Sequence, residues 1–162
     1  MAHYVNNADF LAAITQYRNN VIQAEQEGKS KPQVSNYIGE CILKIATHLS
    51  YKPNFINYSY RDDMILDGVE NCIQYIDNFD PTKSNNPFAY FTQIIWFAFI
   101  RRIDKEKKHL YIKQKTLENF YFEGMLAEQA IDDDKTVSVN LDNEYMKGLV
   151  ESYDKKQAEK QK

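Results

Sequence analysis

The sequence contains little glycine and proline, with five Gly and four Pro among 162 residues. Tight turns depend on these two residue types, so their scarcity disfavours a β-rich fold and favours helices. Hydrophobic residues make up 43% and aromatic residues 14% of the chain, which suits a globular protein rather than a disordered one. We therefore expect an all-α protein with one compact helical domain and a tail.

Long apolar runs are missing as well. No stretch reaches the roughly 18 apolar residues of a membrane span, and no apolar signal core follows Met1. Cys41 and Cys72 lie inside apolar helical patterns, where a thiol usually serves as a small buried side chain in a reducing compartment. The histidines are scattered and make no metal-ligand spacing with them. These absences predict a cytoplasmic protein without membrane contact, metal or other cofactor.

The sequence also lacks the common enzyme motifs. It has no P-loop, no H-E-x-x-H, no G-x-S-x-G and no H-x-E paired with C-x-x-C. Asp62, Asp63 and Asp67 could bind Mg²⁺ in principle, but the first turn of a helix is a poor cage for that ion. An enzyme that acts on nucleic acid stays open as an alternative, and a divalent-metal-dependent cleavage assay would detect it. The prediction is a protein without catalytic residues.

The most distinctive stretch begins at Asn86 and Pro87, an N-cap residue followed by a proline at the first helical position. Between residues 88 and 100 only Thr92 and Gln93 are polar. A globular helix usually keeps one polar face, because only one face lies against the core. This helix is therefore either buried on all sides or has an aromatic face that another molecule covers.

A basic run follows this aromatic stretch. Residues 101–115 contain seven Lys or Arg and two acids, although the whole chain has a net charge of −3. Positive charge is thus concentrated beside the aromatic residues. Aromatic rings stack on unpaired bases and cations bind phosphates, so the combination favours nucleic-acid binding.

Four other segments show helical periodicity. They span about residues 7–28, 34–50, 60–78 and 113–130, and an acidic linker follows at 131–136. The third is expected to bury Ile65, Val69, Cys72, Ile73 and Ile76, and the fourth to be the last packed piece. The predicted division is a helical domain at 1–130 and a linker with a C-terminal peptide at 131–162.

The outer face of the helix at 60–78 has an unusual composition. Leu66 should lie beside Asp63 and Asp67 on the side that faces solvent. Acids in a first turn complement the helix dipole, which accounts for Asp62 and Asp63 but less well for Asp67. An apolar side chain with an acidic rim is typical of a docking site for another protein.

Three blocks in this order and spacing resemble region 2 of the sigma-70 family. They are Asp62–Gly68, Tyr75–Pro81 and Pro87–Phe91. The closer resemblance is to the short late-transcription sigma factors of T-even-type phages and their marine relatives. It is dense over roughly Val34 to Glu118. It implies a compact helical domain like sigma region 2, in a protein of the host cytoplasm that binds core RNA polymerase and melts promoters.

The resemblance assigns the helix at 60–78 to the coiled coil of the polymerase clamp, in the largest subunit. The implied polymerase-binding residues are Asp63, Leu66, Asp67, Val69 and Ile73. The family usually has Gln at the position of Leu66, so this chain departs from the pattern there.

The resemblance assigns the aromatic helix to bases flipped out of a −10-like promoter element. Phe91 stands where the family has the stacking Tyr, while Ile94 and Ile95 replace a Trp pair and Ala98 replaces a Gln that reads duplex. We therefore expect a different wedge and a different direct readout. The implied DNA-binding residues are Phe88, Tyr90, Phe91, Ile94, Ile95, Trp96, Arg101, Arg102, Lys105 and Lys108.

The C-terminal peptide has an apolar stripe at helical spacing. It either folds back on the core or docks in a groove of a partner. The resemblance implies binding to the phage sliding clamp, and a late co-activator as a further partner, because the chain has no helix-turn-helix domain for a −35 element. The stripe consists of Leu141, Tyr145, Met146, Leu149, Val150 and Tyr153. An alternative function is a polymerase-binding regulator that does not contact DNA.

Overall fold

The computed structural model describes residues 4–129 and 144–160. Their elements are α1 (Asn7–Gln26), α2 (Asn36–Ser50), α3 (Arg61–Gln74), the 3-10 helix η1 (Ile76–Asn78), α4 (Pro87–Gln129) and α5 (Glu144–Lys160). No strand occurs in these two described ranges, which confirms the all-α fold class. Within the same ranges, no helix is long and apolar enough to cross a membrane.

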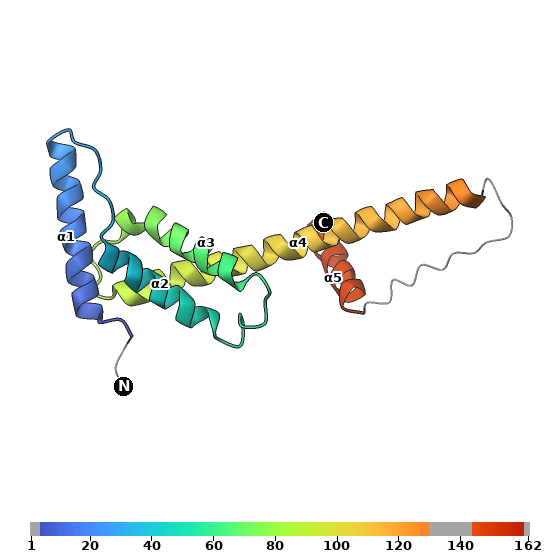
Figure 1. Cartoon of the computed structure of the whole chain (residues 1–162), viewed down its shortest axis with the longest axis horizontal. Coiled ribbons are helices and arrows are strands. Elements are labelled where there is room, and N and C mark those ends of the chain that lie inside the picture. The colour runs from blue at the N-terminus through green and yellow to red at the C-terminus, as the bar shows by residue number, and fades with distance from the viewer. Residues whose placement is uncertain (1–3, 130–143, 161–162) are drawn as a thin grey trace. The chain divides into compact units, whose positions relative to one another are not determined.

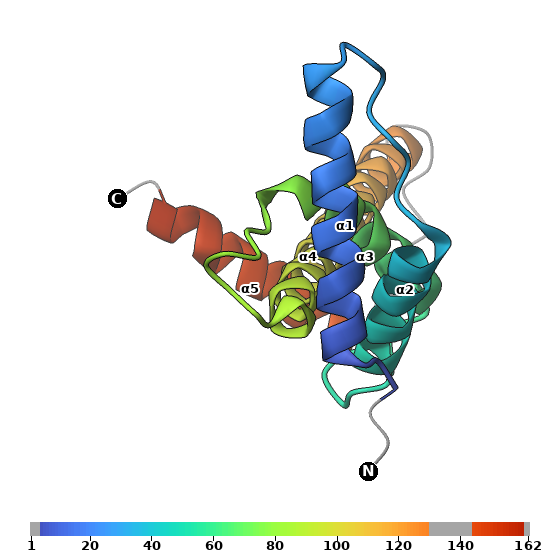
Figure 2. The ribbon, with the colours of Figure 1, turned by 90° about the vertical axis from the view of Figure 1, so that its left-hand side faces the viewer.

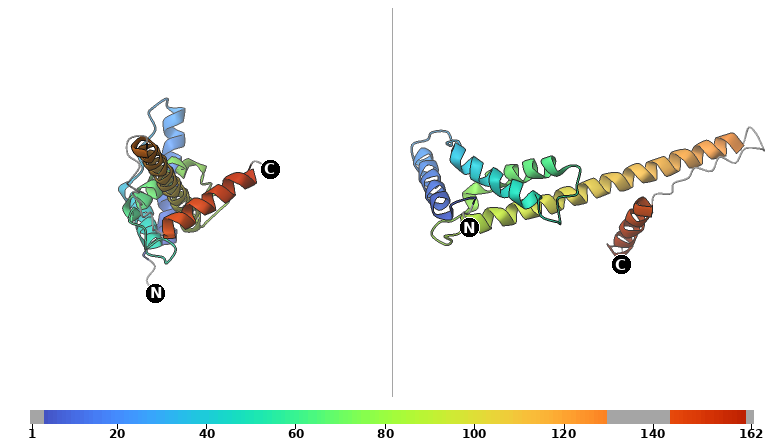
Figure 3. Two further views of the ribbon diagram at one scale, coloured as in Figure 1. Left: turned by 90° about the vertical axis from the view of Figure 1, so that its right-hand side faces the viewer. Right: turned by 60° about the horizontal axis from the view of Figure 1, so that its bottom comes forward.

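The chain divides into two compact units, Met1–Arg102 and Ile103–Lys162. The division falls inside α4, which is one uninterrupted helix (Figure 3). The boundary predicted at residue 130 lies outside the described residues and stays a prediction. The distal part of α4 was expected to be packed, and this was wrong. Leu117 is 38%, Phe120 72% and Tyr121 42% exposed.

Local signals set the helix boundaries of the first unit. The side chain of Asn6 accepts hydrogen bonds from the backbone N–H groups of Ala8 and Asp9 and so caps α1. Gly28 follows this helix with φ of 65°, a conformation that favours glycine. Asn86 caps α4 in the same way, because its Oδ1 accepts from Ala89 N at 3.1 Å.

The first unit is arranged around the beginning of α4. Helices α2 and α3 lie along it, and α1 crosses it (Figures 1 and 2). Aromatic rings fill the space between these elements. Phe91 is fully buried, with its ring centroid 5.5 Å from that of Phe10 and 6.3 Å from that of Phe79. Phe55, from the loop after α2, packs edge-on against Trp96 and Phe99 at 4.8 and 5.1 Å.

The packing of α3 on α4 depends on a glycine. A Cβ atom at Gly68 would lie 3.1 Å from Ile95 Cγ2 and 3.2 Å from Phe99 Cε1. The absence of a side chain therefore lets the two helices approach closely. Cys72, one turn further along α3, is completely buried and donates from Sγ to the Phe91 carbonyl at 3.8 Å.

This close approach corrects the predicted stripe of α3. The buried residues of the helix are Met64, Gly68 and Cys72, at a spacing of four residues. Ile73 was expected in the core but is 44% exposed, and Val69 is half-buried. The face of α3 that packs on α4 has Gly68 at its centre. This packing turns the β-branched residues Val69 and Ile73 outward.

Gly68→Val should lower the free energy of unfolding by about 1–3 kcal/mol, the usual cost of overpacking. The added methyl groups would press against Ile95 and Phe99, which are themselves fully buried. Urea unfolding measures the change. Gly39→Val is the matched control, because an added Cβ there has no neighbour within 4 Å. An unchanged midpoint for Gly68→Val would show that α4 gives way at no cost.

Stability should also fall at high pH because of Cys72. Burial raises the pKa of this thiol to about 12, whereas an unfolded thiol has a pKa of about 8.5. When the pH exceeds the pKa of the unfolded thiol, the unfolded state loses a proton that the folded state keeps. Unfolding should therefore become easier by up to about 1.4 kcal/mol per pH unit. Urea titrations at several alkaline pH values should show a shallower decline for Cys72→Ala than for the wild type.

Candidate functional site

The outer face of α3 exposes apolar side chains beside acids. Leu66 is 64% exposed, as the sequence predicts, and Ile73 lies two turns further along the same side. The Asp63 side chain is 55% and the Asp67 side chain 33% exposed. We call Asp63, Leu66, Asp67 and Ile73 the acidic face. An exposed leucine surrounded by carboxylates is suited to a partner with an apolar side chain between cations.

Arg102 of α4 binds both carboxylates of the acidic face. Its Nη2 lies 3.2 Å from Asp63 Oδ2, and its Nη1 lies 3.5 Å from Asp67 Oδ2. The arginine side chain is only 17% exposed. A residue predicted to contact phosphate is therefore engaged with two residues predicted to contact polymerase.

Arg101 lies in a different environment from its neighbour. It is exposed, and its Nη2 donates to Asn71 Oδ1 at 3.1 Å. Asn71 in turn donates from Nδ2 to the Asp67 carbonyl at 2.6 Å. Arg101 is thus the more accessible cation at this end of the first unit. The predicted phosphate contacts Lys105 and Lys108 are exposed on the part of α4 that belongs to the second unit.

The aromatic part of α4 has one buried and one accessible face. Phe91 and Ile95 are fully buried, so neither side chain can contact a base in this conformation. Phe97 is 52% and Ile100 38% exposed, which excludes burial of the helix on all sides. The other predicted DNA contacts on this part of α4 are half-buried, namely Phe88, Tyr90, Ile94 and Trp96.

Phe97 is the accessible aromatic residue that the sequence interpretation missed. Ala89, Gln93, Phe97 and Ile100 recur at four, four and three residues, which places them on one side of a helix. All four are exposed. Gln93 is a polar residue in an otherwise apolar stretch. Its place in this set indicates that this side of the helix faces away from the core.

A shallow apolar hollow lies on this accessible face of α4. Its volume is about 420 Å³, within the range of small-ligand sites. Trp96 and Phe97 provide aromatic surface, and Thr92 and Gln93 provide hydrogen-bonding groups. The lining residues are Phe88, Ala89, Thr92, Gln93, Trp96 and Phe97.

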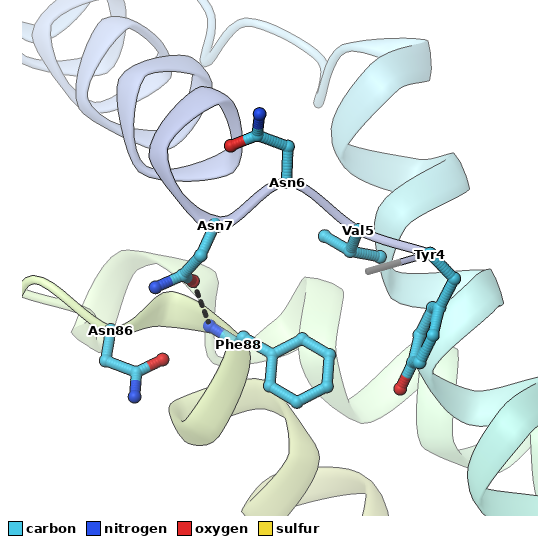
Figure 4. A pocket seen from close by; sticks show the side chains of 6 residues that line it. All are labelled: Tyr4, Val5, Asn6, Asn7, Asn86 and Phe88. Atoms are coloured by element: carbon cyan, nitrogen blue, oxygen red, sulfur yellow. Dashed lines mark hydrogen bonds between the residues drawn. The ribbon is translucent and has the colours of Figure 1, made fainter. Parts of the chain in front are cut away.

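A second hollow of about 490 Å³ lies where the N-terminal segment meets the start of α4 (Figure 4). Phe88 borders both hollows. In the second one, Tyr4 and Phe88 form aromatic walls, with their ring centroids 5.7 Å apart. Asn7 Oδ1 accepts from Phe88 N at 3.1 Å, which fixes the N-terminal segment to α4. The lining residues are Tyr4, Val5, Asn6, Asn7, Asn86 and Phe88.

The C-terminal peptide contacts the distal part of α4 within the second unit. Tyr153 of α5 stacks on Tyr111 with ring centroids 5.0 Å apart, and Tyr111 Oη donates to Asp154 Oδ1 at 2.7 Å. Val150 is half-buried. Of the predicted clamp-binding residues, Leu141 lies outside the described residues, as do the side chains of Tyr145, Met146 and Leu149.

Helix α5 continues to Lys160, although its last turns are rich in charge.

Among the described residues of the chain, no group of three or more His, Cys, Asp and Glu could hold a metal ion. Comparison with known protein families gives no match, and comparison with curated proteins gives none either.

The two faces of α4 should respond differently to truncation. Phe91→Ala removes a fully buried ring and should lower the free energy of unfolding by about 3–5 kcal/mol. Phe97→Ala should change it by less than about 1 kcal/mol, because half of this side chain is in water. Urea unfolding of both variants tests the assignment of faces. Equal losses of stability would mean that Phe97 packs as tightly as Phe91.

Proposed function

We propose that this protein is a minimal sigma factor of the phage late-transcription type. It binds host core RNA polymerase through the acidic face of α3. It holds unpaired bases of a −10-like promoter element on the accessible face of α4, and it carries out no chemistry itself. Its further partners are a late co-activator and a sliding clamp.

The observation that carries this proposal is the accessible aromatic face of α4. Phe97 is left half in water beside a hollow lined by Phe88 and Trp96, although the helix has a well-packed core on its other side. Stacking of a base on an aromatic side chain contributes about 1–3 kcal/mol, which offsets the cost of flipping that base out. Arg101 is exposed at the end of the same unit and is suited to a phosphate.

The proposal moves the stacking role away from Phe91. The resemblance matches that residue to the base-stacking Tyr, but its ring is buried among Phe10 and Phe79. Phe97 and Trp96 take the role in the proposal, with Phe88 at the junction of the two hollows. The motif blocks and the acidic face support the rest of the assignment.

A second candidate is a polymerase-binding regulator that does not contact DNA. Three of the predicted DNA contacts favour it, because they contribute to the packing of the fold. Phe91 and Ile95 are buried, and Arg102 forms ion pairs with Asp63 and Asp67. Such a protein would need the acidic face alone. Transcription from a defined promoter separates the two candidates.

The test is transcription in vitro with host core polymerase, on a supercoiled template with an A/T-rich −10-like element. The wild-type protein should direct transcripts from one start site, read by primer extension. Phe97→Ala should lower the yield by about 5- to 100-fold, the equivalent of one lost stacking contact. Phe122→Ala is the matched control, since it removes an exposed Phe from the same helix.

Leu66→Lys tests the other surface in the same assay. It should abolish binding to core polymerase, because a cation replaces the apolar centre of the acidic face. Leu43→Lys is its control, a change of an exposed leucine on α2. Polymerase binding without any start-site-specific transcript, with clamp and co-activator present, would favour the regulator instead.

A further inference from the structure

We propose that Arg102 is a positioning residue of the acidic face, and that it does not contact DNA. Its guanidinium holds the carboxylates of Asp63 and Asp67 in the arrangement that a basic partner surface binds. This inference rests on the proposed binding of polymerase through α3 and deepens it. It also changes the role that the resemblance gives to Arg102.

Arg102 offsets the electrostatic repulsion between the two acids of the acidic face. Asp63 and Asp67 are four residues apart on α3, so their carboxylates lie one turn apart and repel each other. Arg102 reaches them from α4 with separate nitrogens, at 3.2 and 3.5 Å. A planar guanidinium that binds two acids restricts the rotamers of both. Without it, the two side chains would spread apart and lose orientation before any partner arrives.

Arg102 is much more buried than the two acids that it binds. The Arg102 side chain is 17% exposed, whereas Asp63 is 55% and Asp67 33% exposed. The ion pairs are therefore shielded from water on the arginine side, where such contacts are stronger than at an open surface. A phosphate that approached this guanidinium would compete with two carboxylates that already bind it. Arg101, at the preceding position, is exposed and its recorded contact is to the neutral Asn71.

Part of the acidic face remains available to a partner when Arg102 is bound to it. Each carboxylate uses an oxygen for Arg102 and is still partly exposed to solvent. Leu66 is exposed beside them, and Ile73 is exposed two turns further along the same helix. The surface thus fits a partner helix with an apolar side chain flanked by Lys or Arg. Arg102 fixes the spacing of the acids that this partner must match.

The experiment measures the affinity of the full-length protein for core polymerase by fluorescence anisotropy. Arg102→Gln should weaken binding by roughly 5- to 50-fold, within the range of coupling inside one ion-pair network. Arg102→Lys should restore part of the loss, because a cation again lies between the acids. Lys44→Gln is the matched control, since it removes an exposed cation from α2, and it should leave the polymerase affinity within about twofold of the wild type.

Two further readings separate positioning from a general loss of structure. In an Asp67→Asn background, Arg102→Gln should have a much smaller effect on affinity, because one of the two acids that it positions is no longer charged. Thermal unfolding curves identify a temperature at which every variant is folded, and affinities are compared there. A loss that vanishes under those conditions would overturn the inference.

DNA binding by the polymerase complex is measured as well, because it can contradict the inference. If Arg102→Gln leaves polymerase affinity unchanged but weakens DNA binding and lowers its salt dependence by about one phosphate contact, Arg102 is a DNA contact and the inference fails alone. If the wild-type protein binds no core polymerase, the proposed function fails and this inference fails with it.

Discussion

The close approach of α3 to α4 at Gly68 is the constraint on which the rest of the first unit depends. A missing side chain brings the two helix backbones together and buries Met64 and Cys72 against α4. The same approach turns Leu66 and Ile73 toward solvent. The exposed apolar side chains of α3 are thus a consequence of how its other face packs.

The same approach places charged groups of the two helices within reach of each other. Arg102 follows the last buried aromatic of the first unit, Phe99, by three residues, and there it meets the acids on α3. Its ion pairs depend on the helix spacing that Gly68 allows. The core and the acidic face are therefore physically linked, so a change in helix packing changes the geometry of the acids as well.

Local signals were sufficient to predict the fold class and most helix boundaries. The Asn86–Pro87 start of α4 and the Gly28 end of α1 depend on nearby atoms alone, and both are found. The buried face of α3 could not be predicted in this way, because β-branched residues outnumber the small ones that pack on α4. In the aromatic stretch of α4 the spacing of Gln93 and Phe97 marked the outer side, but the family resemblance assigned the base contact to Phe91, so Phe97 was overlooked.

These differences follow from the geometry of one helix that serves both the core and a surface. Successive residues of α4 point about 100° apart, so neighbours in sequence belong to different environments. Phe99 is buried while Ile100 is exposed, and Arg101 is exposed while Arg102 lies against α3. A family motif read along the sequence assigns one role to such a run. The helix divides that run by face, so each role must be assigned residue by residue from the packing.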